Sequence, residues 1–164
     1  MQRFLAPTIF TLALFAVVLC EAQSVKLSLH DNWSFTVEGD EAWLGARVPG
    51  SVHMDLYRNN KIGDPFYRMN EKDLQWIERE NWRYRTEFTV GENIAGKDRI
   101  DLVFEGLDTY ATVTLNGVKV LEANNMFRGW RANVKEILRG GSNTLEIVFR
   151  SPIDEVMPRY EALG

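Results

Sequence analysis

The sequence predicts an all-β fold, a two-sheet sandwich of jelly-roll type with a few short helical turns. The first observation is the stretch 99–121, where apolar and polar residues alternate with the period of two that is typical of half-buried strands. The second is the dipeptide Asn116-Gly117, which favours a type I′ turn because both residues tolerate a positive φ. The third is that the sequence has no long amphipathic helical pattern. We therefore expect three successive antiparallel strands, a meander, at the centre of the sandwich.

The first 22 residues predict a secretory signal peptide. Arg3 supplies a positive charge, the run 5–19 is mostly apolar and uncharged, and Cys20 and Ala22 have the small side chains that a signal peptidase accepts. The alternative is an uncleaved anchor, but the run is shorter than the roughly 20 apolar residues that a spanning helix needs. We therefore expect cleavage after Ala22.

Residues 23–164 are then enough for one domain with its own hydrophobic core. The only cysteine, Cys20, lies in the predicted signal, so this domain has neither a disulfide nor a thiolate metal site. The net charge is −4, with acidic and basic residues interspersed. This distribution predicts no nucleic-acid partner and no basic patch for a membrane surface.

Around the central stretch, the pattern predicts further strands and short helices. Strands are expected to begin near Leu27 and Leu29 and to cover 33–37, 82–90 and 144–150. Helical segments are expected at Val52–Arg58 with Ser51 as its cap, at one turn from Asp73 to Ile77, at 134–138, and, as helix or linker, at 153–164. The expected core comprises Trp33, Phe35, Tyr84, Phe88, Leu102, Phe104, Val113, Leu115, Leu145, Ile147 and Phe149.

Two pairs of acidic residues are candidates for catalytic groups. Acid/base or nucleophilic catalysis by a carboxyl pair needs two carboxyl groups that converge on one reacting bond. The candidates are Glu105 with Asp108, and Glu78 with Glu80. Glu105 is interpreted as a residue on the solvated face of a strand, and Asp108 as an acceptor of backbone N–H groups in its turn. We therefore predict no catalytic residue in this chain.

The sequence offers no cofactor site. His30 and His53 are the only histidines, and neither has a partner at a spacing that suits a metal ion. There is no phosphate-binding loop and no G-x-S-x-G motif. We predict no metal and no cofactor.

Four side chains in predicted loops are candidates for contact with a sugar or with a neighbouring domain: Trp43, Trp76, Trp130 and Arg128. An aromatic ring can pack on the apolar face of a pyranose, and polar groups beside it can fix the orientation of the sugar. The same residue types are enriched at contacts between domains and proteins. Both interpretations remain open at this point.

Asn32-Trp33-Ser34 fits the acceptor motif for N-glycosylation. In a secreted chain, Asn32 is a candidate glycan site, and the alternative is a chance tripeptide.

Four strings, in this order and spacing, resemble one family. They are RVPGSVHMDLYRNNKIGDPFYRMNE at 47–71, NWRYRTEF at 81–88, VFEGLDTYATVTLNG at 103–117 and NNMF at 124–127. Together they resemble the N-terminal domain of the β-mannosidases of glycoside hydrolase family 2, in particular the animal lysosomal type. The resemblance covers nearly all of residues 27–152. The first string is specific for the mannosidase branch, whereas the third is shared more loosely across the family.

The resemblance implies a sugar-binding, galactose-binding-like jelly roll that accompanies a catalytic (β/α)₈ barrel. In this family the acid/base and the nucleophile are two glutamates of the barrel, beyond the region of resemblance, so no catalytic residue carries over onto this chain. The family commonly has aspartate where Asn124 stands, which puts a role for a charge at that position in question. The resemblance also implies that the domain is incomplete at its C-terminus and that the barrel is its missing partner.

Two functions follow from these observations. The first is the non-catalytic N-terminal part of an enzyme that removes terminal non-reducing β-D-mannose from β-mannoside oligosaccharides, in the breakdown of N-glycans. The second is a free-standing, lectin-like carbohydrate-binding module. With the predicted signal, the first implies the secretory pathway, with the lysosome or the extracellular space as destination.

Overall fold

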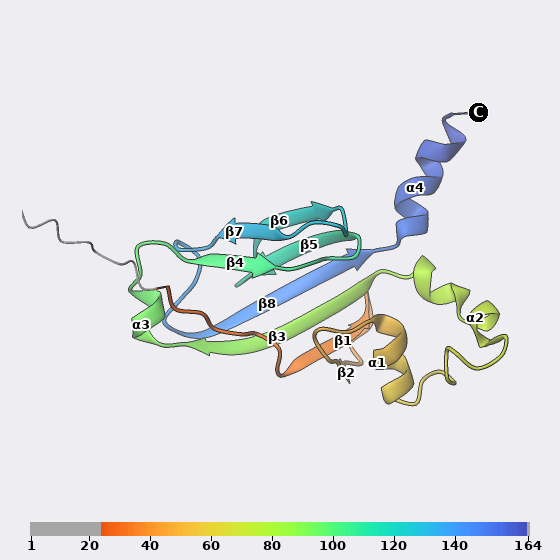
Figure 1. The fold of residues 1–164 in the computed structure, drawn as a ribbon, viewed down its shortest axis with the longest axis horizontal. Coiled ribbons are helices and arrows are strands. Elements are labelled where there is room, and N and C mark those ends of the chain that lie inside the picture. The colour runs from red at the N-terminus through yellow and green to blue at the C-terminus, as the bar shows by residue number, and fades with distance from the viewer. Residues whose placement is uncertain (1–23, 164) are drawn as a thin grey trace, which may run out of the picture.

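The computed structural model describes residues 24–163, so the predicted signal peptide lies outside the described residues. Two antiparallel sheets form the body of the domain (Figure 1). The larger sheet has six strands in the order β2-β1-β3-β8-β5-β6, and the smaller consists of β4 and β7. The strands are β1 Trp33–Val37, β2 Leu44–Gly45, β3 Trp82–Val90, β4 Asp101–Phe104, β5 Tyr110–Leu115, β6 Val118–Asn124, β7 Trp130–Asn133 and β8 Gly141–Arg150. The all-β class is confirmed.

The long strands β3 and β8 form the centre of the larger sheet. They pair over their whole lengths, from Trp82 opposite Phe149 to Val90 opposite Gly141. Alternate side chains of both strands face the smaller sheet, because successive residues of a strand point to opposite faces. The core therefore lies between the two sheets and continues under α1.

The predicted core is largely confirmed. Its buried members are Trp33, Phe35, Tyr84, Val113, Leu115, Leu145 and Ile147. The others are partly buried and pack against this core: Phe88, Leu102, Phe104 and Phe149. Phe35 and Tyr84 stack with ring centroids 5.5 Å apart, and such a pair adds to the free energy gained by burial.

The predicted meander is wrong. Strand β4 pairs with β7 in the smaller sheet, whereas β5 pairs with β6 and β8 in the larger one. The connection between Phe104 and Tyr110 therefore crosses from one sheet to the other. The second reversal is confirmed, since Asn116 and Gly117 have φ values of 52° and 80° in the tight turn between β5 and β6.

Two further strand expectations also need correction. Residues 27–29 are extended but belong to no strand. Trp130, expected in a loop, begins β7, which a pattern interrupted by Arg131 and Asn133 did not reveal.

The helices are short and are α1 Val52–Arg58, α2 Asn70–Asp73, the 3₁₀ turn η1 Gln75–Arg79, α3 Glu92–Ala95 and α4 Pro152–Glu161. Ser51 caps α1 as predicted, accepting a hydrogen bond from the Met54 amide at 3.5 Å. Asp73 ends α2 instead of capping the next turn. Residues 134–138 form a hydrogen-bonded turn. Among the described residues, no helix is long and apolar enough to cross a membrane.

Candidate functional site

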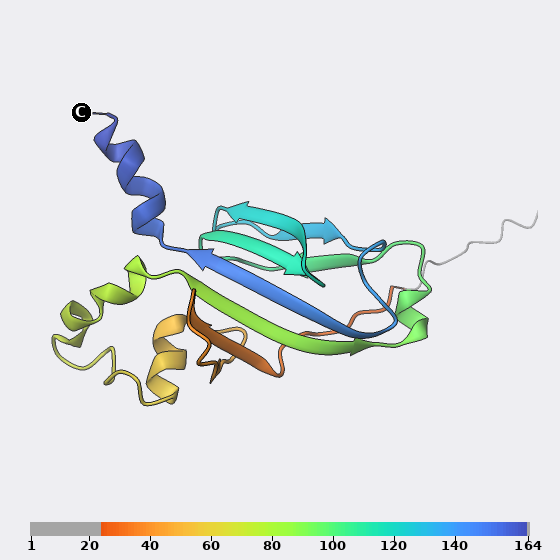
Figure 2. The same ribbon diagram turned by 180° about the vertical axis from the view of Figure 1, so that it is seen from behind.

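One end of the sheets, which we call the α4 end, brings together four segments of the chain (Figures 1 and 2). Trp82 at the start of β3 pairs with Phe149 near the end of β8, so the segment before β3 lies at this end. Tyr110 pairs with both Arg150 and Asn124, which places the β4–β5 and β6–β7 connections there as well. Helix α4 follows β8 directly and contacts η1.

Large apolar side chains are unusually exposed at the α4 end. Phe66 is 85% exposed, Phe127 is 88% exposed and Tyr160 is 71% exposed. Further exposed apolar side chains at this end are Tyr67, Met69, Trp76, Met126, Val156 and Met157. Exposed apolar side chains from several segments at one end of a domain are typical of a surface that another protein or domain covers.

The segment 61–81, here the excursion, holds its exposed rings by polar contacts of the backbone. Asp64 accepts a hydrogen bond from the Phe66 amide at 2.9 Å, and its carbonyl oxygen accepts one from the Asn70 side chain at 2.8 Å. The guanidinium of Arg68 lies 5.0 Å from the centroid of the Tyr67 ring. The rings are therefore presented on an ordered turn.

The end of the excursion is fixed to the sheets and to α4. Trp82 donates its indole N–H to the carbonyl oxygen of Ile77 at 2.9 Å. The hydroxyl of Ser151, at the cap of α4, donates to the carbonyl oxygen of Glu78 at 2.8 Å, and its amide donates to Asn81 Oδ1 at 2.7 Å. Hydrogen bonds therefore fix the end of the excursion to the start of α4.

A buried aspartate anchors the start of this region. Asp55 on α1 is 1% exposed and accepts hydrogen bonds from the Arg47 amide at 3.1 Å, Arg58 Nη1 at 2.9 Å and the Tyr84 hydroxyl at 3.2 Å. Burial, together with the neighbouring Asp55 carboxylate, raises the pKa of the Tyr84 phenol well above its ordinary value. Tyr84 therefore acts as a neutral donor, and the cluster joins α1, the segment before it and β3.

Sequence reasoning missed Asp55, although a pattern that points to it is present. Val52, Asp55 and Leu56 have the i, i+3, i+4 spacing of one helix face, and Leu56 is buried. An acidic residue on an apolar face is either paired or functional, because burying an unpaired charge is costly.

Trp43 packs on the outer face of the larger sheet. The guanidinium carbons of Arg85 and Arg83 lie 4.0 and 5.1 Å from the centroid of its ring. Arg83 also forms an ion pair with Glu146 at 3.1 Å. Because arginine already stacks on the indole, a sugar ring would have to displace it.

Trp130 and Arg128 form a similar pair near the α4 end. The Arg128 guanidinium lies 4.3 Å from the Trp130 ring centroid, and the indole N–H donates to the Asn125 carbonyl oxygen at 3.1 Å. Trp76 contacts a different partner, Trp82, at a centroid distance of 6.1 Å. Trp43 therefore lies apart, on the outer face of the sheet, whereas the other three belong to the α4 end.

Of the four acidic residues in the two candidate pairs, Glu80 is half-buried and the other three, Glu78, Glu105 and Asp108, are exposed. Strand β4 ends at Phe104, so Glu105 is not the strand residue that we expected. Asp108 accepts a hydrogen bond from the Thr109 hydroxyl. Within residues 24–163, no three histidine, cysteine or acidic side chains form a group that could hold a metal ion.

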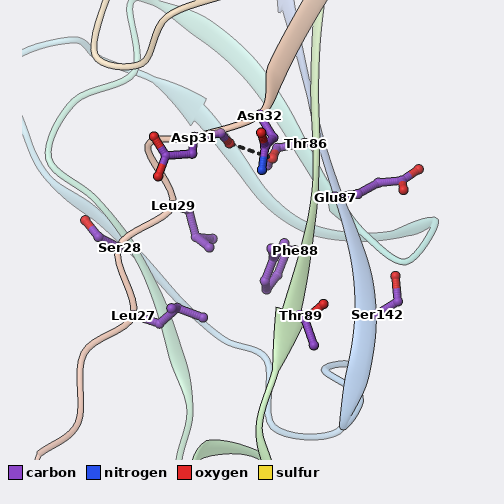
Figure 3. Close-up of a pocket in the computed structure, with 10 residues that line it drawn as sticks. All are labelled: Leu27, Ser28, Leu29, Asp31, Asn32, Thr86, Glu87, Phe88, Thr89 and Ser142. Carbon is purple, nitrogen blue, oxygen red and sulfur yellow. Dashed lines mark hydrogen bonds between the residues drawn. The ribbon is translucent and has the colours of Figure 1, made fainter.

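A hollow of about 370 Å³ lies beside β3, away from the α4 end (Figure 3). Leu29 of the extended segment and Phe88 of β3 face each other across it. Asn32 is exposed and lies at its rim, where the Thr86 hydroxyl donates to the Asp31 carbonyl oxygen at 3.1 Å.

Comparison with known proteins identifies the family. The model of the family described as "Glycosyl hydrolase 2 galactose-binding domain-like" matches residues 33–164, which is most of the chain. This chain belongs to that family. The relatives that match are named β-mannosidase, and the match covers their N-terminal part.

Two curated relatives of the domain are a goat β-mannosidase, 36% identical over 137 residues, and β-mannosidase B of Aspergillus terreus, 45% identical over 133 residues. The matches cover 84% and 78% of this chain but only 16% of each relative. The chain therefore spans about one sixth of the length of the curated relatives it matches.

Solved structures give the same picture. The β-D-mannosidase of Dictyoglomus thermophilum matches with a TM-score of 0.79 and 44% identity, over 81% of this chain and 16% of that one. The β-D-glucuronidase of the same organism matches with a TM-score of 0.56 and 22% identity, over 75% of this chain and 19% of that one, and so shares the fold alone.

Proposed function

We propose that this chain acts as the non-catalytic N-terminal domain of a β-mannosidase that hydrolyses terminal non-reducing β-D-mannose residues in β-mannoside oligosaccharides. The single observation that carries the proposal is the sequence similarity to enzymes named β-mannosidase, which reaches 45% identity and covers about four fifths of this chain. The exposed positions of Glu78, Glu105 and Asp108 fit a non-catalytic role, because glycoside hydrolysis needs carboxyl groups that converge on the scissile bond.

The partner is the catalytic domain of the same enzyme, and it docks on the α4 end. Three observations support this surface: the exposed aromatic rings, the ordered turn that presents them, and the direct contact of α4 with η1. Aromatic and methionine side chains are the residues that interfaces favour. Trp76, Trp130 and Arg128 belong to this surface and contact the catalytic domain.

An exchange of domains tests the proposal. The matching sixth of the D. thermophilum β-D-mannosidase is replaced by residues 24–164 of this chain, and hydrolysis of a chromogenic β-mannoside is measured. We expect the hybrid to retain activity that the enzyme lacking this domain loses. A hybrid no more active than the shortened enzyme, or mannoside turnover by the present chain alone, contradicts the proposal.

The alternative is a free-standing lectin-like module, in which a sugar ring would pack on the indole ring of Trp43. Arg83 and Arg85 occupy that ring, which argues for the first proposal. Calorimetric titration of the chain with mannose-containing oligosaccharides separates the two, because saturable binding by the chain alone supports the lectin.

The predicted signal peptide supports passage through the secretory pathway. The resemblance to the animal lysosomal type, together with the goat relative, favours the lysosome as destination, and the extracellular space is the alternative. Fractionation of cells that express the full chain, with a lysosomal marker, tests this.

A further inference from the structure

We infer that Asn32 carries an N-linked glycan that covers the hollow beside β3 and the part of the β3 edge that no neighbouring strand pairs. This inference rests on the secretory route of the proposed function. It concerns a modification site and its effect on this domain.

Asn32 is the single acceptor motif in the 164-residue sequence, and its surroundings suit a glycan. The residue is exposed, lies in a bend just before β1, and has a φ of 59°. The middle residue of the motif, Trp33, is buried and holds the bend against the core. Its indole N–H donates to the Leu29 carbonyl oxygen at 2.8 Å.

The edge of β3 is open beside this asparagine. Strand β1 pairs with β3 only from Val37 opposite Trp82 to Trp33 opposite Thr86. Beyond Thr86, residues 87–90 pair with β8 on one side, and the extended segment 24–30 on the other side forms no ladder with them. An unpaired strand edge is a template for pairing with another chain, and proteins usually cover or blunt such edges.

The hollow at this edge has the mixed chemistry of a surface on which a sugar can rest. Leu29 and Phe88 line it from opposite sides with apolar side chains, and Asp31, Glu87 and Ser142 are among its polar lining residues. Asn32 also lines a second hollow, with Arg85 and Glu87 among its other lining residues. A sugar attached to Asn32 therefore starts between the two hollows.

The position is compatible with docking at the α4 end. Asn32 lies next to the Trp33–Thr86 pair, at the level of Glu87. Glu87 lies five positions along β3 from Trp82 at the α4 end, a distance of about 17 Å along the strand. A glycan at Asn32 leaves the exposed rings of the α4 end free.

The modification is a group transfer onto the side-chain amide. Asn32 Nδ2 forms a bond to C1 of N-acetylglucosamine, the bond from C1 to the diphosphate of a lipid-linked oligosaccharide donor breaks, and the diphosphate leaves with the electron pair. Nδ2 loses one proton, which a base of the transferase that catalyses this step accepts. No oxidant or reductant takes part.

The test uses the full chain expressed in a mammalian cell line in two versions, one with its own N-terminus and one with residues 1–22 replaced by an established secretory leader. Glycan is detected in lysate and medium as a mass removed by peptide N-glycosidase, and its site is mapped by mass spectrometry. We expect a glycan on Asn32 that is lost in Asn32→Gln and Ser34→Ala. Ser28→Ala is the matched control, because Ser28 lines the same hollow outside the motif, and it should keep the glycan.

The covering of the edge has its own readout. Hydrogen exchange of residues 86–90 and the rate of aggregation are compared before and after enzymatic removal of the glycan. We expect faster exchange and faster aggregation after removal.

An unmodified Asn32 in the version with the established leader overturns the inference, and so does a glycan whose removal changes neither exchange nor aggregation. If only the version with its own N-terminus lacks the glycan, the secretory route of the proposed function fails, and with it the glycan on the natural chain. The glycan on the other version would still show that Asn32 is a competent acceptor.

Discussion

The Tyr84 hydroxyl donates a hydrogen bond to Asp55 Oδ2 at 3.2 Å, which ties helix α1 to the central strand β3. Asp55 is 1% exposed, and three donors surround its carboxyl group. Breaking a buried pair by removing one partner costs far more than the pair contributes when intact, because a group is left without its hydrogen bond. This contact therefore controls whether the segment leading to the excursion stays on the sheet.

Replacing Tyr84 with phenylalanine should lower the free energy of unfolding by about 1–3 kcal/mol, since one oxygen of a buried carboxylate loses a donor. Urea unfolding followed by tryptophan fluorescence measures the change. Tyr57→Phe is the matched control on the exposed side of α1 and should stay within about 0.5 kcal/mol of the parent. Equal effects of the two substitutions would show that the Asp55 contact contributes nothing specific.

Stability should fall in alkaline solution through Tyr84. Its pKa is raised in the folded protein, so above the ordinary tyrosine pKa of about 10 the unfolded chain loses this proton while the folded chain keeps it. The contribution of Tyr84 to the free energy of unfolding is fully present below pH 10. Above pH 10 it decreases by up to about 1.4 kcal/mol per pH unit. Urea midpoints between pH 9 and 11 measure the slope, which should be shallower in Tyr84→Phe. An unchanged slope in that variant would contradict the assignment.

In the tight turn between β5 and β6, the cost of losing side-chain hydrogen bonds can be separated from the cost of a positive φ. Asn116 has a φ of 52°. Its side-chain Nδ2 donates to the Ile137 carbonyl oxygen at 3.0 Å and to Asn143 Oδ1 at 2.9 Å. Asn116→Gly loses these bonds but keeps the backbone conformation, whereas Asn116→Ala also pays for a positive φ.

We expect the alanine variant to be less stable than the glycine variant by about 0.5–1 kcal/mol, and both to be less stable than the parent. Thermal unfolding of the three proteins decides this. The reverse order of the two variants would mean that backbone strain is not significant at this turn.

The strands were predictable because their residues alternate, but strand partners were not. The run up to Phe104 has the right period, yet β4 pairs with β7, and the alternation of one strand does not depend on which neighbour it has. Strand β7 itself was missed because its four residues include Arg131 and Asn133, which suit an exposed edge. Short edge strands carry little apolar signal.

The candidate site was less predictable than the fold. Trp76, Trp130 and Arg128 could be singled out as two aromatic side chains in predicted loops and a charged neighbour. Phe66 and Phe127 could not be told from core residues by type alone. Phe66 lies on a turn that the polar contacts of Asp64 and Asn70 hold. The Phe127 amide instead donates to Asn125 Oδ1 at 2.8 Å. The alternation of Arg83 and Arg85 placed both on one face, but that Trp43 packs on them required the structure.

The exposed rings at the α4 end should matter for the whole enzyme and not for this domain. Phe66 is 85% exposed and Phe127 is 88% exposed, so changing either to serine should alter the free energy of unfolding of the isolated chain by no more than about 0.5 kcal/mol. In the hybrid with the D. thermophilum enzyme, the double variant loses the aromatic anchors of the interface. We expect mannoside hydrolysis to fall at least tenfold, the effect of losing about 1.4 kcal/mol, because anchor residues carry most of the energy of an interface.

Val118→Ser is the matched control for these variants. Val118 is exposed but follows the Asn116-Gly117 turn, at the far end of the sheets, so activity of the hybrid should be unchanged. Comparable losses with Val118→Ser and with the double variant would place the interface elsewhere. A double variant that is unstable as an isolated chain would show instead that Phe66 and Phe127 support the fold of this domain itself.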